Sequence, residues 1–445
     1  MRSLLQLVLA ALLLAQLPAN AQQEAPAGAI WLLELDGAVG PATSDYIVRG
    51  LARAGDAGAR LVVIRMDTPG GLDTAMRDII EGILASPVAV ATWVSPQGAR
   101  AASAGTYILY ASHIAAMAPA TNLGAATPVP LGAPGPAQVP KPEDPDADAD
   151  DAPEGTAMDR KMVNDASAYI RGLARLRGRN AEWAEQAVRE AASLSAEEAL
   201  EAGVIDIVAR SLQDLRQQSE GRVVEVNGED VALALAGAPV YEASPDWRTE
   251  FLTIITNPSL VLILGMIGFY GIILEFYNPG SLVPGTIGVI CLLLAGYALQ
   301  LLPVNYAGLA LLVFGIALMV AEAVSPSFGI LGIGGLAAFM FGGVILFDTD
   351  VEAFQVAWPL LAAIGVVSGA FIMITITIAM RMRHQRVTTG VEQLVGSEGK
   401  ALGADQVRVG SEIWEAHSDQ PLQAGDTVVV REVRGLKLFV EKEQS

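Results

Sequence analysis

The sequence predicts a chain of three parts: an α/β domain with a mainly parallel sheet, an α-helical membrane domain, and a small all-β domain. The first observation behind this prediction is an uneven distribution of charge. Charged residues form 17% of the 445 residues, against about 25% in soluble proteins, and residues 251–380 contain no Lys or Arg. The second observation is that strand-like and helical patterns alternate before this segment, whereas short strand-like runs separated by glycines follow it.

The composition excludes several classes of protein and site. The 28 basic and 48 acidic side chains give a formal net charge of −20, which disfavours nucleic acid as a partner because affinity for phosphate depends on basic side chains. Apolar residues make up 52% of the chain, so it is too hydrophobic to be wholly disordered. The single cysteine, Cys291, excludes an intramolecular disulfide and a cysteine-rich zinc site.

The first 21 residues have the pattern of a secretory signal peptide. Arg2 precedes an apolar run from Leu4 to Leu17, and Ala19 and Ala21 supply the small residues of a cleavage site. The pattern favours a signal peptide at 1–21, with an uncleaved membrane anchor as the alternative. In either case residues 22–250 are expected outside the cytoplasm.

Strand-like and helical segments alternate through the extracytoplasmic part. Such alternation predicts a mainly parallel sheet with helices on its faces. Strands are expected at 30–35, 61–66, 88–94, 114–117 and 204–208. Helices are expected at 45–54, 72–84, 103–111, 157–177 and 181–191, and a further short helix is expected after the capping box formed by Ser195 and Glu198.

Two loops that follow predicted strands could build a site. Gly70 and Gly71 lack side chains, so their backbone N–H groups can approach a ligand closely. Ser103 lies among small residues at a predicted helix start, where the helix dipole and free N–H groups would stabilise an oxyanion. The alternatives are that Ser103 is an ordinary N-cap and that the two glycines form an ordinary turn.

A hydroxyl nucleophile needs a base, and the candidates are few. His113 is the only histidine of the extracytoplasmic part, and a lone histidine beside a strand is more often structural. A lysine can serve if burial lowers its pKa. Lys141 lies in a Pro- and Asp-rich stretch, whereas Lys161 lies on a predicted amphipathic helix, two turns before Tyr169. On spacing alone Lys161 could equally be a solvated surface lysine.

The glycine loop, the Ser103 segment and the Lys161 helix resemble the protease domain of the NfeD family. Members of this family are membrane-bound serine proteases of the Clp protease-like class. The resemblance implies a Clp protease/crotonase-like fold and extends through the membrane domain and the C-terminal tail. In the extracytoplasmic part it rests on Asp67–Gly71, Ala101–Ile108, Ala116–Pro119, Lys161, Ala168–Ile170, Gly178–Ala181 and Leu194–Val208.

The resemblance also implies roles for individual residues. Ser103 would be the nucleophile and Lys161 its general base, which together form a Ser/Lys dyad. The oxyanion hole would come from backbone N–H groups of Gly70 or Gly71 and of Ala104. We therefore expect activity to rise with pH, since the lysine must be neutral to take the serine proton.

An acidic insertion is predicted at 124–158, between the two residues of the dyad. It is rich in Pro, Ala, Asp and Glu, and such a composition cannot bury enough apolar surface to order itself. It could form a mobile flap near the cleft or an inert solvated insertion.

The membrane domain is expected at 251–380. Five apolar runs, at about 256–275, 283–302, 306–324, 328–347 and 356–380, each approach the ~20 residues that cross a bilayer as a helix. A basic cluster follows the last run, with Arg381 and Arg383 among its members, which predicts a cytoplasmic C-terminus.

A repeat is visible inside the membrane domain. A shift of 47 residues pairs Glu275 with Glu322, together with several glycines and a proline after each glutamate. Each glutamate could cap a helix hairpin at the headgroup level, or it could be a functional ionisable group at membrane depth.

Residues 391–445 are predicted to form a cytoplasmic OB-like barrel of five short strands. Exposed aromatic and basic residues are too few for an oligonucleotide surface. The resemblance instead implies a protein-interaction role with stomatin-like membrane proteins. Trp414 could anchor such a partner, or it could belong to the core of the barrel.

The sequence therefore predicts an integral-membrane serine endopeptidase that cleaves hydrophobic protein segments, including those of stomatin-like partners. The alternative is a catalytically idle scaffold that recruits such partners through its tail. An acyl-CoA enzyme of the crotonase fold conflicts with secretion. We expect no cofactor and no metal, a location in a bacterial inner membrane with the protease domain in the periplasm, and a homo-oligomer that is a dimer or larger.

Overall fold

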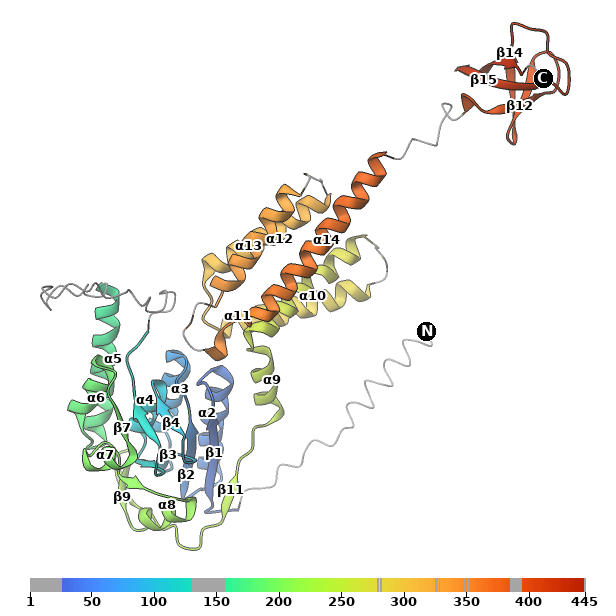
Figure 1. Cartoon of the computed structure of the whole chain (residues 1–445). Helices are drawn as coiled ribbons and strands as arrows, with labels where there is room; N and C mark the ends of the chain where they lie inside the picture. The colour runs from blue at the N-terminus through green and yellow to red at the C-terminus, as the bar shows by residue number, and fades with distance from the viewer. Residues whose placement is uncertain are drawn as a thin grey trace, which may run out of the picture. The chain divides into compact units, whose positions relative to one another are not determined.

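The computed structural model describes residues 26–129, 157–277, 280, 282–324, 327, 329–347, 349, 352–384 and 394–443. Within these residues the chain forms an α/β domain, a group of apolar helices and a closed β-barrel (Figure 1). The predicted signal peptide at 1–21 lies outside the described residues.

The α/β domain is built on a six-stranded sheet in the order β11-β1-β2-β3-β5-β8, in which every neighbouring pair is parallel. The predicted parallel sheet is therefore confirmed. Strands β1, β2 and β3 consist mostly of buried residues, as expected for a parallel sheet covered on both faces. The strands are β1 (Ile30–Asp36), β2 (Leu61–Asp67), β3 (Val90–Val94), β5 (Ile114–Met117), β8 (Ile207–Val208) and β11 (Val240–Glu242).

Six helices described in this domain, α2 to α7, lie close to predicted positions, whereas α8 and α9 were not predicted. All eight residues of α4 are buried, and the predicted capping box is present at the start of α7, where Glu198 accepts the Ser195 N–H at 2.9 Å. The helices are α2 (Pro41–Asp56), α3 (Asp73–Leu84), α4 (Ala104–Ala111), α5 (Ala157–Leu176), α6 (Ala181–Arg189), α7 (Ala196–Glu201), α8 (Leu212–Ser219) and α9 (Trp247–Ile255).

A second, three-stranded sheet was not predicted. It joins β4 (Arg100–Ala102), β6 (Asn122–Gly124) and β7 (Ser193–Ser195), with β4 parallel and β7 antiparallel to β6. A short hairpin of β9 (Val223–Val226) and β10 (Glu229–Ala232) completes the strands described in this domain.

The second sheet corrects the predicted start of the acidic insertion. Gly124 belongs to β6, the N–H of Ala125 donates to Ala192 at 2.9 Å, and the N–H of Ala126 donates to Ala187 at 2.8 Å. These backbone hydrogen bonds fix a segment that composition alone assigned to the insertion. Residues 130–156 of the insertion lie outside the described residues, whereas 157 and 158 begin α5.

Among the described residues, five apolar helices lie in the predicted membrane domain: α10 (Pro258–Tyr277), α11 (Val283–Leu301), α12 (Tyr306–Val324), α13 (Ile330–Ile345) and α14 (Trp358–His384). Among the described residues, α10 and α11 contain segments that are long and apolar enough to cross a membrane, at 258–276 and 283–301. Shorter apolar segments lie at 306–322, 330–345 and 358–367.

The repeat extends from sequence to hydrogen bonding. The Glu275 carboxylate accepts the N–H groups of Gly280, Leu282 and Gly285. The Glu322 carboxylate accepts those of Ser327, Gly329 and Gly332, which are the residues at the same three spacings. Each carboxylate thus holds the turn into the following helix, α11 or α13, which supports the interpretation of both glutamates as hairpin caps.

The C-terminal residues form a closed barrel in the order β12-β13-β14-β16-β15, which confirms the predicted five-stranded OB-like domain. The core is made by alternate strand residues and includes Val407, Val428 and Leu438, all fully buried. The strands are β12 (Glu398–Ala401), β13 (Gln406–Val409), β14 (Glu412–His417), β15 (Thr427–Arg434) and β16 (Lys437–Lys442).

Candidate active site

Ser103 has a backbone conformation that serine rarely adopts. It connects β4 to α4 with φ of +51° and ψ of −116°, and a non-glycine residue held in such a sparsely populated region stores roughly 1–3 kcal/mol of strain. It occupies the N-cap position of α4, yet its side chain makes no capping hydrogen bond. The interpretation of Ser103 as an ordinary N-cap is therefore not supported, and its hydroxyl is left for another role.

Gly70 faces the Ser103 side chain. Its φ is +118°, and a Cβ atom at this position would lie 2.7 Å from the Ser103 Cβ and 3.2 Å from the Ser103 Oγ. Gly71 is equally constrained, because a Cβ atom there would lie 2.1 Å from the carbonyl oxygen of Val39. The structure therefore brings together the two loops that the sequence singled out; Gly70 allows their close approach, whereas Gly71 allows close packing against the backbone of Val39.

Backbone pairing fixes these loops. The Ser103 N–H donates to the Gly124 carbonyl at 3.0 Å, and the Ala102 N–H donates to the Thr68 carbonyl at 3.1 Å. The Thr106 hydroxyl, on the first turn of α4, donates to the same Gly124 carbonyl at 3.0 Å. The unpredicted second sheet is thus what positions Ser103.

The candidate oxyanion donors differ in their hydrogen bonding. The Gly70 N–H donates to the Thr68 hydroxyl at 3.1 Å. Within the described part of the chain, the N–H groups of Gly71 and Ala104 have no acceptor. These two unpaired N–H groups belong to the residue after Gly70, which faces Ser103, and to the residue after Ser103 itself.

Lys161 lies near the start of α5 and its side chain is exposed. Across residues 26–129 and 157–277, no hydrogen bond joins it to Ser103. The helices α4 and α5 nevertheless run in the same direction, because Tyr107 stacks on Tyr169 at 6.2 Å and Arg177 donates to the carbonyl of Ala111 at 2.9 Å. Lys161 therefore lies toward the end of α5 that corresponds to the Ser103 end of α4. The other lysine considered, Lys141, lies outside the described residues.

His113 is a structural residue. It follows the opposite end of α4, and an eight-residue helix is about 12 Å long. Its Nδ1 accepts the Val90 N–H at 3.1 Å. Burial, with the positive charges of Arg177 and Arg179, lowers the pKa of His113 to about 3. The imidazole is therefore neutral and already engaged, and it does not serve Ser103.

A cluster centred on Arg77 links the three helices around the site. Its guanidinium pairs with Asp73 at 2.8 Å and with Asp165 of α5 at 2.9 Å, and it lies 4.6 Å from the ring centre of Tyr169. Tyr169 in turn stacks on Tyr107 of α4. The sequence offered only the Asp73–Arg77 spacing, which is typical of any exposed helix, so this cluster was missed.

Arg179 holds the far end of α4. Its guanidinium donates to the carbonyls of Tyr110 and Ser112 at 2.9 Å each and pairs with Asp206 at 2.6 Å, with 2% of its side chain exposed. A buried cation at a helix C-terminus satisfies the last carbonyl groups and complements the helix dipole. The helix that starts at Ser103 is thus fixed at both ends.

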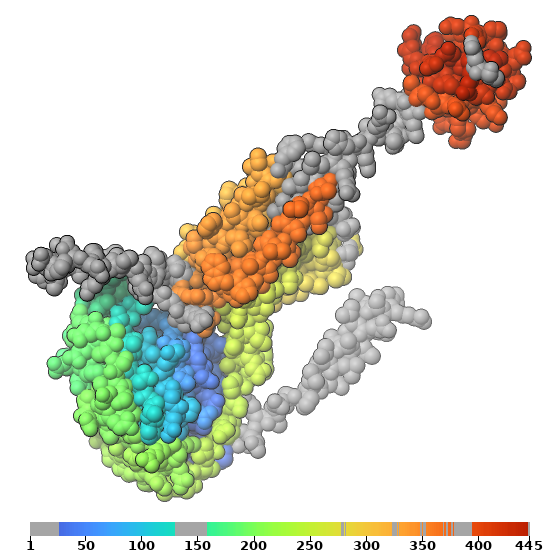
Figure 2. All heavy atoms as spheres, in the orientation of Figure 1, coloured from blue at the N-terminus to red at the C-terminus, as the bar shows by residue number. Residues whose placement is uncertain are grey.

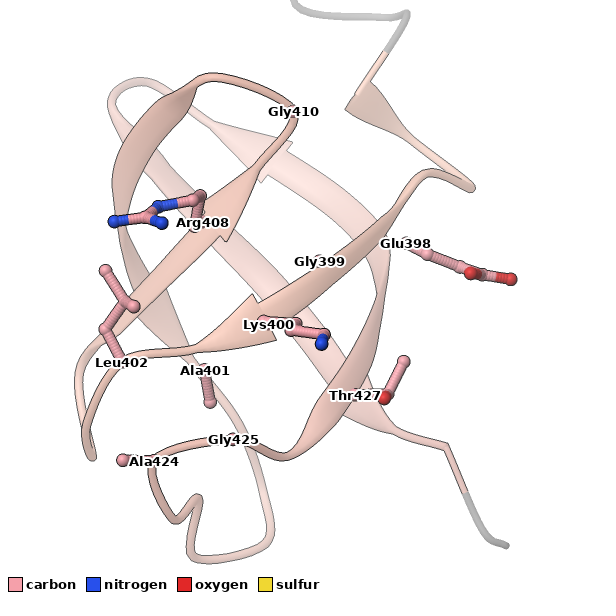
Figure 3. A pocket seen from close by; sticks show the side chains of 10 residues that line it. All are labelled: Glu398, Gly399, Lys400, Ala401, Leu402, Arg408, Gly410, Ala424, Gly425 and Thr427. Atoms are coloured by element: carbon pink, nitrogen blue, oxygen red, sulfur yellow. The ribbon is translucent and has the colours of Figure 1, made fainter.

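Other features could in principle hold ligands. Among the described residues, no group of three or more His, Cys, Asp or Glu side chains is placed to hold a metal ion. The barrel carries an open pocket on β12, β13 and the 424–425 turn, which includes two cationic side chains, Lys400 and Arg408, and the apolar Leu402 (Figure 3).

Comparison with protein families finds three NfeD matches along the chain. Residues 259–378 match the NfeD integral membrane domain, residues 29–135 match the N-terminal domain of NfeD1b, and residues 391–442 match the NfeD-like C-terminal, partner-binding domain. The three matches follow the same order as the α/β domain, the apolar helices and the barrel.

Two characterised proteins are similar over most of the chain. Membrane-bound protease PH1510 of Pyrococcus horikoshii is 32% identical over 431 residues, which cover 93% of each chain. Membrane protein NfeD1b of Bacillus subtilis is 29% identical over 398 residues, which cover 86% of this chain and 80% of that protein.

Solved structures of a 1510-N membrane-bound stomatin-specific protease also match. A serine-to-alanine mutant is 34% identical over 50% of this chain and 100% of its own, with a TM-score of 0.43. A lysine-to-alanine mutant in complex with a substrate peptide is 34% identical over 51% of this chain and 97% of its own, with a TM-score of 0.44.

Proposed function

The chain belongs to the NfeD family of membrane proteins, and from this premise we propose that it is a serine endopeptidase with Ser103 as nucleophile and Lys161 as general base. The observation that carries the proposal is Ser103 itself. Its backbone is held at φ of +51°, its hydroxyl caps nothing, and a glycine faces it. Strain of this kind persists only where the surrounding fold maintains it, and it is concentrated at functional sites.

The site supports acyl transfer by a Ser/Lys dyad. Neutral Lys161 accepts the proton of the Ser103 hydroxyl while Oγ attacks the carbonyl carbon of the scissile bond. The N–H groups of Gly71 and Ala104 receive the oxyanion that forms. The lysine then protonates the leaving amine, which breaks the C–N bond, and a water molecule hydrolyses the ester on Ser103.

Because Lys161 is exposed, we infer that the dyad forms only when substrate is bound. A lysine base is favoured by burial, yet Lys161 is exposed and has no hydrogen bond to Ser103 in the part of the chain that the structure describes. Catalytic hydrogen bonds commonly tighten only when substrate is bound. In this proposal a substrate strand between α5 and the Ser103 loop shields Lys161 from water and completes the dyad.

The substrates proposed are hydrophobic protein segments, including those of stomatin-like partners. The support is the similarity to a protease described as stomatin-specific and the match of residues 391–442 to a partner-binding domain. We further propose a multi-pass protein of a bacterial inner membrane, homo-oligomeric, with its protease domain in the periplasm and its barrel in the cytoplasm. The basic residues after the last apolar run support this orientation.

A second candidate is a catalytically idle scaffold that recruits stomatin-like proteins through its barrel. The separation of Lys161 from Ser103 favours it, since a general base must come within hydrogen-bond reach of its proton.

Cleavage of a hydrophobic peptide by the purified full chain decides between the two candidates. For the protease, Ser103→Ala and Lys161→Ala each abolish cleavage, and the wild-type rate rises with pH. Arg175→Ala removes an exposed cation from the same helix, α5, and serves as the control that retains activity. Cleavage that persists at the wild-type rate in both dyad variants would rule out the dyad, and a wild-type chain that cleaves nothing would favour the scaffold.

A further inference from the structure

The short helix α9 connects the α/β domain to the first apolar helix. Only residues 256 and 257 separate the end of α9 from the start of α10. One face of α9 is buried through Thr249, Leu252 and Ile255. Arg49 of α2 holds the start of the helix, with its guanidinium 2.6 Å from the carboxylate of Asp246 and 3.0 Å from the Thr249 hydroxyl. The helix is therefore fixed to α2 of the α/β domain.

The opposite face of α9 is apolar and exposed. Trp247, Phe251 and Ile254 expose 77%, 39% and 59% of their surfaces. Their spacing of four and then three residues places them on one stripe, because an α-helix turns about 100° per residue. A surface helix of a soluble domain normally turns polar residues outward. Part of the α9 surface, in yellow-green, is uncovered in Figure 2.

We propose that this stripe is inserted into the interface of the lipid bilayer. Tryptophan is enriched at the level of the headgroups, and a helix that is apolar on one face lies in the interface plane with that face buried. Lipid is the expected partner of the stripe because α9 runs directly into the membrane domain, whose family match begins at residue 259. The three residue steps from Ile255 to Pro258 span at most about 11 Å, so the end of α9 lies close to the bilayer.

Insertion of the stripe would anchor the α/β domain to the membrane in one orientation. Because Arg49 and the buried residues of α9 tie this helix to α2, inserting its stripe sets the orientation of the whole α/β domain on the membrane. This anchoring requires the membrane domain that the family match identifies and does not require the proposed peptidase chemistry.

Spin-label accessibility in the full chain tests the proposal. Single cysteines replace Trp247, Phe251 and Ile254 in a Cys291→Ala background, and the labelled proteins are reconstituted into phosphatidylcholine vesicles. The control label replaces Val223 of β9, an apolar residue that is 61% exposed. The expected result is higher collision with oxygen and lower collision with a water-soluble nickel chelate at the three stripe positions than at the control.

Two results would overturn the proposal. Nickel accessibility at the stripe equal to that at residue 223 places the stripe in water, and dipolar broadening between labels that vanishes on dilution with unlabelled protein places it against a second copy. Trp247→Phe provides a readout that introduces no label: brominated phosphatidylcholine should quench more of the wild-type fluorescence than of the variant's. Equal quenching in the two proteins would contradict insertion.

Discussion

Gly70→Ala is the substitution that most sharply separates the geometry of the site from its stability. The new Cβ would lie 2.7 Å from the Ser103 Cβ, and ordinary van der Waals contact begins at 3.4 Å, so the two carbons must separate by about 0.7 Å. Misplacing a reacting group by about 1 Å can lower a rate by about 10²-fold. We therefore expect the rate of peptide cleavage to fall roughly 10- to 100-fold.

The same substitution also strains the backbone, and a matched control removes that contribution. Gly70 has φ of +118°, a sparsely populated backbone region that costs a residue with a side chain about 1–3 kcal/mol in folding free energy. Gly98 also has a positive φ, +87°, but a Cβ atom there meets nothing within 4 Å. Gly98→Ala is thus expected to carry a similar backbone cost without lowering activity.

The assay compares cleavage rates and urea unfolding for the wild type and the two alanine variants. We expect both variants to lose unfolding free energy, Gly70→Ala by more because of its Cβ overlap, and we expect the loss of activity to be confined to Gly70→Ala. Full activity in Gly70→Ala would refute this expectation, because Ser103 would then have room that the structure denies. Equal loss of activity in both variants would also refute it, because the effect would then come from stability alone.

Three further predictions concern other parts of the molecule. Arg77→Met should lower the unfolding free energy by about 1 kcal/mol and should slow peptide cleavage, because α5 loses its ion pair with α3. A double-mutant cycle with Asp165→Asn measures the coupling between the two residues, and additive effects would contradict the predicted coupling. Burial lowers the pKa of His113 to about 3, so between about pH 6.5 and pH 3 the imidazole is protonated in the unfolded chain and neutral in the folded one. The unfolding free energy should therefore fall as the pH drops below about 6.5. Urea titrations should show a weaker pH dependence of stability in His113→Gln, and an unchanged dependence would show that other groups cause it. Glu322→Gln should lower the unfolding temperature in detergent more than Glu275→Gln, since Glu322 is 2% exposed and orphaned buried N–H groups cost about 1–3 kcal/mol each; equal shifts would contradict this ranking.

Most of the main sheet was predictable, because strands such as β1, β2 and β3 have a clear local sequence pattern, but β11 (Val240–Glu242) was not predicted. The segment Leu61–Met66 is rich in β-branched and other apolar residues and is interrupted only by Arg65, which suits a strand that is buried on both faces. The strands β4, β6 and β7 have three residues each. Their composition carries no strand signal, and their pairing joins segments far apart in sequence, so no local pattern could reveal them.

The candidate site was predictable in part. Gly70, Gly71 and Ser103 stood out because small residues and a hydroxyl follow predicted strands, and the structure brings them together. The Arg77 cluster did not stand out, because its pair with Asp165 joins residues 88 positions apart. The Ser/Lys pairing came from family resemblance, since spacing alone leaves Lys161 indistinguishable from a surface lysine.

The most direct test of the central claim is to locate the adduct of a fluorophosphonate probe on the full-length protein by mass spectrometry. An activated serine is phosphonylated by such probes, whereas an ordinary hydroxyl is not. We expect a single adduct on Ser103, no adduct in Ser103→Ala, and markedly slower labelling in Lys161→Ala at neutral pH. An adduct on a different serine, or an unreactive Ser103 in protein that is folded and membrane-inserted, would contradict the claim.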